Sequence, residues 1–254
     1  MIDVYEQADR MAVGFSMDYP SGLHTGMHSH PKAQLIYGIS GVMNVETEDA
    51  YFVLPPTKAL FLPPDEDHSI FMEGEVSMRE MFIDRTLAAT VAPEARVLTV
   101  GPLLRELLVA ICNEPIDWEQ DGRCPHIIAL IIDEIRRSRT LLTRLPSVRE
   151  ARASRVAKAI MDNPADARSL DDWGETCGAS SRTLARLFLR ETGMTFGQWR
   201  LQARLNAAFV LLMTDGDLPR IAQKVGFSSQ SAFGVAFRRA FGLTPAQARA
   251  LRLD

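Results

Sequence analysis

The sequence of 254 residues contains only three cysteines, at positions 112, 124 and 177, and no two of them are close together. An odd number of scattered cysteines indicates neither a disulfide framework nor a cysteine zinc site, so we expect free thiols. Long apolar runs are also missing, because no stretch approaches the roughly 20 residues that a membrane helix requires. The first ten residues carry three acidic side chains where a signal peptide would be basic and then apolar. We therefore expect a cytoplasmic protein with no membrane partner.

Excess positive charge is missing from the chain as a whole, whose formal net charge is -4. The charge is unevenly distributed, however. Residues 149–254 hold 16 Lys and Arg against 10 Asp and Glu, a net charge of +6, and the remainder has a net charge of -10. This asymmetry predicts that the carboxyl-terminal part meets a polyanion. The composition, 46% hydrophobic and 24% charged, is typical of a soluble globular protein long enough for two domains.

The amino-terminal part contains short β-branched or aromatic runs separated by turn residues. They predict strands at residues 34–40, 42–47, 51–54, 59–62, 69–72 and 76–83. The proline pairs Pro55-Pro56 and Pro63-Pro64 fit strand ends or turns, because proline cannot donate to a sheet ladder. Many short strands of this kind favour a barrel or a sandwich.

From Pro102 onward the apolar residues recur at helical spacing. Two helices are predicted, one containing Leu103 to Ile111 and one containing Ile127 to Ile135. Their apolar faces are broad, so one face could pack on the strands and another on a second subunit, which makes a homodimer our expectation. A boundary is predicted near Leu145-Pro146-Ser147, because the residue before proline disfavours helix.

The carboxyl-terminal part contains an internal repeat. Leu184 and Phe233, Phe188 and Phe237, and Gly193 and Gly242 are each separated by 49 residues. Each copy predicts a helix, a glycine turn and a second helix. Ser169 with Asp172, and Asp217 before Leu218-Pro219, are expected to cap the first helices, and Gly178 and Gly226 to end them. Serines at 180 or 181 and at 228 or 229 are expected to cap the second helices.

The second helix of each copy has distinct faces. Leu184, Leu187 and Phe188 share one face in the first copy, which leaves Arg182 and Arg186 pointing away. One helix-turn-helix is weak evidence for DNA binding, but two in register on the basic side of an acidic protein are much stronger. A single helix, Phe196 to Thr214, is predicted between them, with an apolar stripe of Leu201, Leu205, Ala208 and Leu212. Beside it, Arg200 and Arg204 are candidates for phosphate contact or for a solvated face.

Residues 155–249 resemble the DNA-binding domain of the AraC/XylS family. The matching positions are Ser180, Leu184, Arg186, Phe188, Glu191-Thr192-Gly193, Arg204-Leu205, Ile221-Ala222, Val225-Gly226-Phe227, Phe233, Phe237-Arg238, Phe241-Gly242 and Thr244-Pro245. The resemblance implies a seven-helix domain whose two recognition helices enter successive major grooves of double-stranded DNA. A linker helix of about 18 residues spans roughly 27 Å, near the separation of grooves one turn apart.

On this resemblance the expected DNA contacts fall at the starts and outward faces of the two recognition helices. They are Ser181, Arg182, Thr183, Arg186, Ser229, Gln230, Ser231, Arg238 and Arg239. Arg182 and Arg186 are the strongest candidates for base edges, because arginine makes paired hydrogen bonds to guanine. In the second helix Gly234 and Val235 offer no hydrogen bond. We therefore predict that the first unit supplies most specificity and that the second grips phosphate or reads thymine methyls.

Four of the five histidines lie in the β-rich part. His28 and His30 alternate on an extended segment, Gln34 follows, and His68 lies after a later proline turn. This pattern resembles the two motifs of the cupin barrel, with Gln34 where a carboxylate is usual and Asp65 where glycine is usual. The resemblance implies a divalent transition metal held by His28, His30, Gln34 and His68. A pocket for an organic effector, or purely structural histidines, are the alternatives.

The predicted fold is therefore α+β and multidomain, and the predicted function is transcription regulation. Residues 1–88 are expected to form a cupin-like sensor barrel, residues 89–146 a helical linker for dimerisation, and residues 147–254 a DNA-binding domain with two helix-turn-helix units. The expected partners are DNA, a small-molecule or metal effector, a second copy and RNA polymerase. A metal-dependent cupin enzyme, and a constitutive DNA binder whose barrel serves only for dimerisation, are the alternatives.

Overall fold

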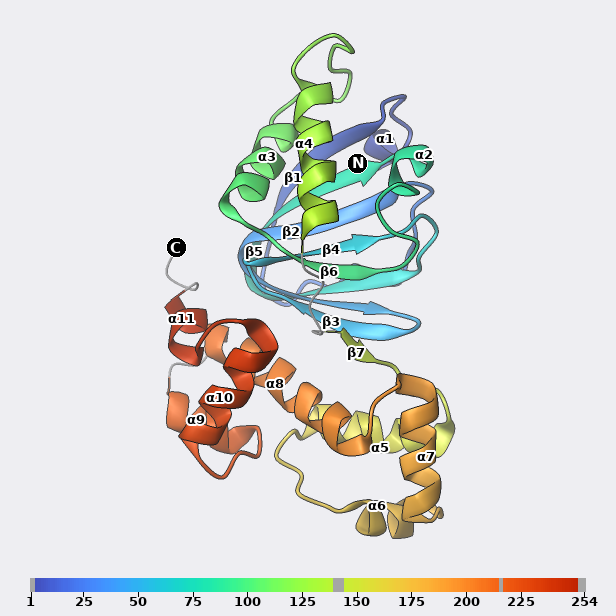
Figure 1. Ribbon diagram of the computed structural model, residues 1–254, viewed down its shortest axis with the longest axis vertical. Helices are drawn as coiled ribbons and strands as arrows, with labels where there is room; N and C mark the ends of the chain where they lie inside the picture. Colours follow the sequence, from blue (N-terminus) through green and yellow to red (C-terminus); the bar gives the residue numbers. More distant parts are fainter. Residues whose placement is uncertain (1–2, 139–143, 215–216, 251–254) are drawn as a thin grey trace. The chain divides into compact units, whose positions relative to one another are not determined.

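The computed structural model describes residues 3–138, 144–214 and 217–250. The chain forms two compact units (Figure 1). The sheet unit consists of Met1–Thr47 and Leu54–Leu142, and the helical unit consists of Glu48–Val53 and Thr143–Asp254. The predicted α+β class, with an antiparallel sheet before a helical domain with two helix-turn-helix units, is confirmed.

The strands of the sheet unit are antiparallel. They are β1 (Ala12–Tyr19), β2 (Ala33–Thr47), β4 (Lys58–Leu62), β5 (His68–Ile83) and β6 (Arg96–Thr99). Strand β5 lies between β1 and β2, and β4 pairs with β2 and β6. The short α1 (Asp3–Glu6) and α2 (Arg85–Ala88) flank β1 and β5 in the sequence.

Two strands are longer than the sequence predicts. The expected breaks near residue 41 and at residues 73–75 are absent, because β2 and β5 continue through them. A register shift between Gly38 and Val42 lets β2 bend without ending. Gly41 has φ 80°, and a Cβ there would lie 2.3 Å from the Glu75 carbonyl oxygen, so only glycine fits this bend. Strands β1 and β6 were not among the predicted strands.

The two helices predicted after Pro102 are present as α3 (Pro102–Cys112) and α4 (Cys124–Arg137). They cover one face of the sheet and share a core with the odd-numbered side chains Leu35 and Tyr37 of β2. Helix α3 lies directly on β1, because a Cβ at Gly14 would be 2.5 Å from the Ile111 carbonyl oxygen. The even-numbered side chains of β2 therefore point to the opposite face of the sheet.

The helical unit contains α5 (Ala151–Asp162), α6 (Leu170–Cys177), α7 (Ser181–Thr192), α8 (Phe196–Thr214), α9 (Leu218–Lys224), α10 (Gln230–Phe241) and α11 (Pro245–Ala250). The predicted single helix between the repeats is confirmed as α8. The predicted boundary at residues 145–147 carries a short strand, β7 (Arg144–Pro146), which pairs with β3 (Ala50–Leu54). The Trp199 indole nitrogen donates to the Pro146 carbonyl oxygen at 2.8 Å and anchors β7 to α8.

Candidate functional site

The first helix-turn-helix, α6 and α7, begins and turns as its sequence dictates. Ser169 and Asp172 form a reciprocal capping box at the start of α6. Gly178 ends α6 with φ 66°, a left-handed conformation that glycine adopts without steric cost. Of the two candidate serines, Ser180 caps α7, and its hydroxyl accepts from the Thr183 amide. These local signals fix the angle at which α7 leaves the turn.

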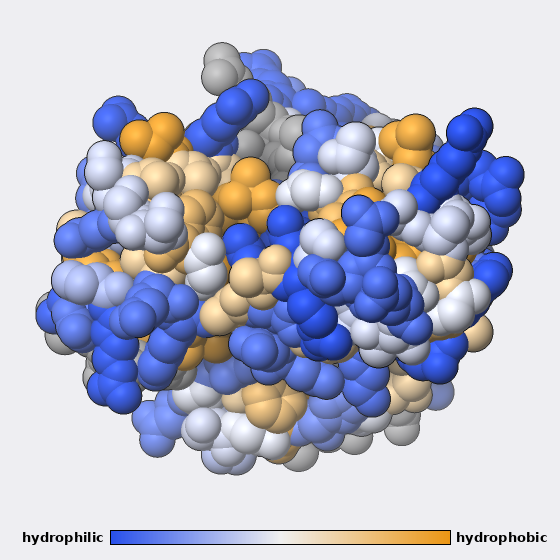
Figure 2. Space-filling view, turned by 90° about the horizontal axis from the view of Figure 1, so that it is seen from below, coloured by the Kyte–Doolittle hydropathy of each residue, from blue (hydrophilic) through white to orange (hydrophobic). Residues whose placement is uncertain are grey.

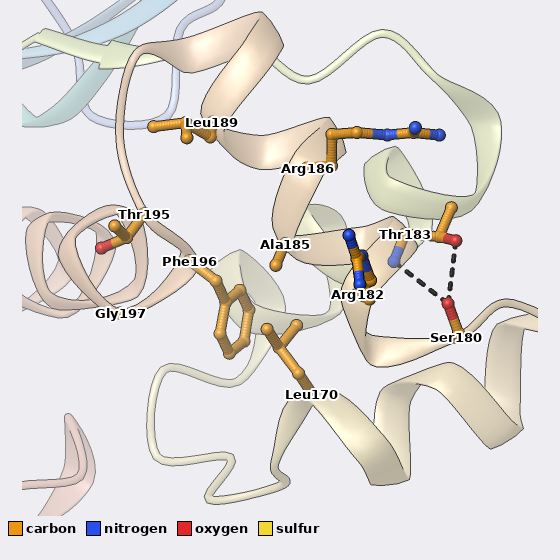
Figure 3. A pocket seen from close by; sticks show the side chains of 10 residues that line it. All are labelled: Leu170, Ser180, Arg182, Thr183, Ala185, Arg186, Leu189, Thr195, Phe196 and Gly197. Atoms are coloured by element: carbon orange, nitrogen blue, oxygen red, sulfur yellow. Dashed lines mark hydrogen bonds between the residues drawn. The ribbon is translucent and has the colours of Figure 1, made fainter.

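Helix α7 buries one face and exposes the other, as predicted. Leu184, Leu187 and Phe188 are at most 3% exposed, whereas Arg182 and Arg186 are exposed. Both arginines line an open cleft of about 630 Å³ (Figure 3). The apolar side chains of this cleft come from three helices and include Leu170, Ala185, Leu189 and Phe196. The exposed face of α7 thus combines two cations with apolar surface.

The second helix-turn-helix, α9 and α10, repeats this arrangement with differences. Gly226 follows α9 with φ 78°, and Ser229 caps α10 through the Ala232 amide. Asp217 occupies the N-cap position of α9, but its side chain makes no capping hydrogen bond, so the expected capping role was wrong. The backbone of Asp217 is extended, with φ -100° and ψ 106°, and leads into the helix without a side-chain cap. Phe233 and Phe237 are buried, as predicted.

The remaining DNA-contact candidates lie at the starts and on the outer sides of the two helices. Gln230, Ser231, Arg238 and Arg239 are exposed, and Val235 beside them is 71% exposed. Ser229 is exposed, whereas Ser181 and Thr183 are half-buried. The Thr183 hydroxyl lies 2.9 Å from that of Ser180 (Figure 3), so it is partly engaged within the turn.

The recognition-helix arginines are free to bind a partner. Within the described residues, Arg182, Arg186, Arg238 and Arg239 make no ion pair and no side-chain hydrogen bond. Arg190 on the same helix as Arg186 instead pairs with Glu191 at 2.8 Å. Viewed from one side, the surface carries mostly hydrophilic residues, with apolar residues in separate patches (Figure 2). Exposed and unpaired guanidinium groups favour a polyanion as the partner.

The linker helix α8 corrects two expectations. Leu205, Ala208 and Leu212 are buried as predicted, but Leu201 is 41% exposed and lies outside the core. Arg200 and Arg204 were expected either to reach phosphate or to stay solvated. Both instead donate to backbone carbonyl oxygens within the helical unit, at 2.8–3.2 Å. All three guanidinium nitrogens of Arg204 are thus engaged by the protein, whereas Arg200 uses only Nη1.

Three of the five histidines of the sheet unit come together. One ring nitrogen from each of His28, His30 and His68 lies within 4.8 Å of the others. A bridge between two segments causes this, because the amides of His28 and His68 donate to each other's carbonyl oxygens at 2.9 and 2.8 Å. His30 and His68 are 6% and 1% exposed. His24 lies outside the cluster, with its Nδ1 accepting from the Gly26 amide at 3.0 Å.

The hydrogen bonds of the three rings decide which nitrogen is available. Nδ1 of His28 faces the Gly26 carbonyl oxygen at 2.9 Å, and Nδ1 of His68 faces that of Glu66 at 2.8 Å. Nδ1 of His30 faces Glu6 Oε1 at 2.7 Å. Carbonyl and carboxylate oxygens only accept, so each Nδ1 carries the proton and each Nε2 keeps its lone pair. Nε2 of His30 and His68 is buried without a hydrogen-bond partner in the described structure.

Burial favours the neutral form of two of the three rings. Burial lowers the pKa of His68 to about 4. Burial also lowers the pKa of His30, although the Glu6 carboxylate opposes this shift. Neutral imidazoles whose Nδ1 protons are held by outer acceptors are the usual ligands of transition metals.

Gln34 lies beside this cluster on β2. It is 2% exposed and stands opposite Phe82 in the sheet, whose ring is 5.2 Å from that of His30. Its Oε1 has no partner among the described residues. The Gln34 amide hydrogen-bonds to the buried Glu80 carboxyl, whose pKa burial raises to about 7. Three imidazoles are thus gathered here, and the unpartnered amide oxygen of Gln34 belongs to the neighbouring strand.

Two residues of this region had no local sequence signal. Glu6 lies 24 residues before the histidine that it orients, and Glu80 lies inside a strand of otherwise ordinary pattern. Asp65, by contrast, stands out in the sequence because glycine is usual at its position in the cupin motif. Asp65 has φ 64°, so the left-handed conformation is kept, and its carboxylate pairs with Arg85 at 2.6 Å. Aspartate tolerates this conformation better than most residues.

Comparison with known proteins agrees with this architecture. The family model described as AraC-like ligand binding domain matches residues 13–146, more than half of the chain. The model described as Helix-turn-helix domain matches residues 173–250 and includes both repeats. Within the described residues, every helix is too short or too polar to span a membrane.

Individual relatives are named as HTH-type transcriptional regulators. The chain is 27% identical over 223 residues to the HTH-type transcriptional regulator NimR of Escherichia coli (strain K12), covering 88% of this chain and 81% of NimR. It is 32% identical over 220 residues to the HTH-type transcriptional regulator RipA of Corynebacterium glutamicum, covering 84% of this chain but only 60% of RipA. An AraC-type DNA-binding domain structure from Chromobacterium violaceum is 32% identical over 40% of this chain and 91% of its own, with a TM-score of 0.38. The chain therefore belongs to the AraC family of DNA-binding transcription regulators with a ligand-binding domain.

Proposed function

We propose that this protein is a cytoplasmic, effector-responsive regulator that reads two adjacent DNA boxes with α7 and α10. The observation that carries this proposal is the pair of capped helix-turn-helix units, each presenting unpaired arginines on its exposed face. The length of α8, 19 residues, supports it, since about 1.5 Å per residue brings the units roughly one helical turn of DNA apart.

The DNA contacts divide into base-reading and phosphate-binding groups. Arg182 and Arg186 read guanine edges in the first box, where their exposed guanidinium groups make paired hydrogen bonds. In the second box Gln230 and Ser231 are the polar readers, and Val235 contacts thymine methyl groups. Arg238 and Arg239 bind phosphate, as do the groups around the helix starts at Ser181, Thr183 and Ser229.

Selection of DNA from a random duplex library by the full chain tests this function. We expect enrichment of one sequence with two boxes whose centres lie about 10.5 base pairs apart. A library that remains unenriched at physiological salt would contradict sequence-specific binding. Arg238→Ala and Arg239→Ala should each lower affinity for all sequences and reduce the salt dependence by about one phosphate contact.

We further propose that His28, His30, His68 and Gln34 hold a divalent transition metal whose occupancy is sensed. The convergence of three imidazole rings, two of which have a buried Nε2 without a partner, favours this ligand. A nitrogen-rich set suits zinc, copper, nickel or cobalt. A tetrahedral ion with bonds of about 2.1 Å requires nitrogens about 3.4 Å apart, so ring nitrogens that lie within 4.8 Å of one another would close in to hold it.

Metal analysis of purified protein, with His28→Ala and His68→Ala as variants, tests this site. We expect about one metal ion per chain, lost in both variants, and a change in DNA affinity when the metal is removed. An organic effector bound equally well by both variants would instead support an effector pocket. An unchanged DNA affinity with every ligand would support a constitutive binder.

Dimerisation and catalysis complete the proposal. We propose a homodimer through α3 and α4, where Leu103 and Leu130 are 52% and 48% exposed, and RNA polymerase as the further partner. Sedimentation of a monomer would contradict the dimer. The assignments of residues 1–88 to sensing, 89–146 to dimerisation and 147–254 to DNA binding belong to this proposal. A regulatory role without catalysis agrees with the relatives, and turnover by the metal-loaded protein would contradict it.

A further inference from the structure

The Arg204 side chain connects the two helix-turn-helix units. It leaves α8, and its Nε donates to the Pro164 carbonyl oxygen at 2.8 Å. Its Nη2 donates to the Asp166 carbonyl oxygen at 2.9 Å. Both acceptors belong to the loop between α5 and α6, which leads into the first helix-turn-helix and is called the first-unit loop below. Its Nη1 donates to the Gly226 carbonyl oxygen at 3.2 Å, in the turn between α9 and α10 of the second unit.

The loop and the turn also touch each other at this point. A Cβ built on Gly226 would lie 2.8 Å from Arg204 Cζ and 3.1 Å from the Ala165 Cα atom. The glycine turn therefore packs directly on the guanidinium plane and on the backbone of the first-unit loop. A side chain at position 226 would push the turn and the loop away from each other. It would also be strained, because the φ of this residue is 78°.

The first-unit loop is itself fixed. Asp166 accepts from the Arg168 guanidinium at 2.6–3.1 Å, and this guanidinium stacks 3.6 Å from the centre of the Trp173 ring. Trp173 lies in α6 and is 3% exposed. One turn before Arg204, Arg200 donates to the Arg168 carbonyl oxygen at 2.9 Å. Arg200 thus bonds only to the first-unit loop, whereas Arg204 bonds both to this loop and to the turn of the second helix-turn-helix.

We propose that Arg204 is a positioning residue that holds α7 and α10 at a fixed relative orientation and thereby sets the box spacing that the protein accepts. This inference rests on the proposed reading of two boxes. Binding the three carbonyl oxygens requires three donors of one planar guanidinium group. A lysine ammonium cannot direct its donors in the same way. Loss of the group leaves three carbonyl oxygens without these donors and lets the second unit pivot on α8.

Spacing dependence of DNA binding tests this role. One inserted base pair shifts the second box by about 3.4 Å and about 34° around the helix axis. The spacing ratio is the Kd for the duplex with one inserted base pair divided by the Kd for the selected duplex. We expect a ratio of about ten or more for the unchanged protein and a ratio near one for Arg204→Gln. Arg204→Lys should resemble Arg204→Gln.

Arg200→Gln is the matched control, because it removes a hydrogen bond to the first unit but none to the second. Its spacing ratio should equal that of the unchanged protein. An Arg204→Gln variant that binds more weakly but keeps the full ratio would overturn the proposal, since it would then be merely less stable or less attracted to DNA.

A second measurement does not depend on DNA. Spin labels at Leu189→Cys and Val235→Cys, both highly exposed, report the distance between α7 and α10 in the full chain with alanine at the three native cysteines. We expect a narrow distribution that broadens in Arg204→Gln but stays narrow in Arg200→Gln. An equally narrow distribution in Arg204→Gln would overturn the clamp. A failure to select any DNA would instead overturn the proposed function and leave this measurement valid.

Discussion

Glu6 Oε1 lies 2.7 Å from Nδ1 of His30, and this contact leaves Nε2 as the free nitrogen of a nearly buried ring whose centre lies 4.9 Å from that of His28 and 5.3 Å from that of His68. Outer acceptors of this kind raise the basicity of a ligand and hold its ring in place. The amino-terminal helix α1, in which Glu6 lies, is thereby linked to the histidine cluster.

Removal of this acceptor should weaken metal binding. In Glu6→Ala the His30 ring loses its fixed orientation and tautomer, so we expect affinity for cobalt or zinc to fall about 10- to 100-fold in a competition titration. Glu94→Ala, which removes an exposed carboxylate elsewhere in the sheet unit, is the control and should bind as before. Equal affinity of the two variants would show that Glu6 plays no part in the site.

The capping residues predict unequal losses of stability. Ser180 and Ser229 each accept from a backbone amide at 3.2 Å, so Ser180→Ala and Ser229→Ala should each lower the free energy of unfolding by about 1 kcal/mol. Asp217 makes no such bond, and Asp217→Ala should cost well under about 0.5 kcal/mol. Urea denaturation measures all three. A loss at Asp217 as large as that at Ser180 would contradict the observed cap.

The two turn glycines are expected to differ although their φ values are similar. A Cβ at Gly178 meets nothing within 4 Å, so Gly178→Ala should cost about 1 kcal/mol for the left-handed backbone alone. Gly226→Ala adds a clash with Arg204 and the Ala165 backbone, so its cost should be clearly larger. Comparison of the two unfolding free energies checks this, and equal costs would mean that the Gly226 turn relaxes freely.

Lys58 predicts a pH-dependent stability. It is 3% exposed, bonds to Thr99 Oγ1 at 3.0 Å, and burial lowers its pKa from 10.5 to about 8. Between pH 8 and 10.5 the unfolded chain binds the additional proton, so this group makes the protein more stable as the pH rises through that window. Lys58→Met should therefore stabilise the protein by about 1–3 kcal/mol at pH 7. The gain should shrink toward pH 10, and a gain independent of pH would contradict this account.

Local signals in the sequence predicted the helical unit well. The caps at Ser169 and Ser180, the glycine ends and the apolar faces of α7 and α10 all follow from residues a few positions apart. The sheet unit was predicted less completely. The long strands β2 and β5 bend at Gly41, and only the approach of the Glu75 backbone reveals that this glycine continues a strand.

The side-chain networks likewise divide into contacts that local sequence spacing predicts and contacts that only the tertiary fold creates. The convergence of His28, His30 and His68 follows a motif spacing, but Glu6 joins them through tertiary contact alone. Arg200 and Arg204 form a basic pair at helical spacing, which suggested phosphate contact. Their carbonyl acceptors lie 22 to 40 residues away, so folding rather than spacing decides what these arginines bind.

The central claim is that two recognition helices read DNA unequally. Binding of Arg186→Ala and Gln230→Ala to all single-base variants of the selected duplex tests it most directly. We predict that Arg186→Ala loses discrimination at one base pair of the first box, about 1–3 kcal/mol, while Gln230→Ala changes the base preference much less. Intact base preference in Arg186→Ala together with its loss in Gln230→Ala would contradict the account.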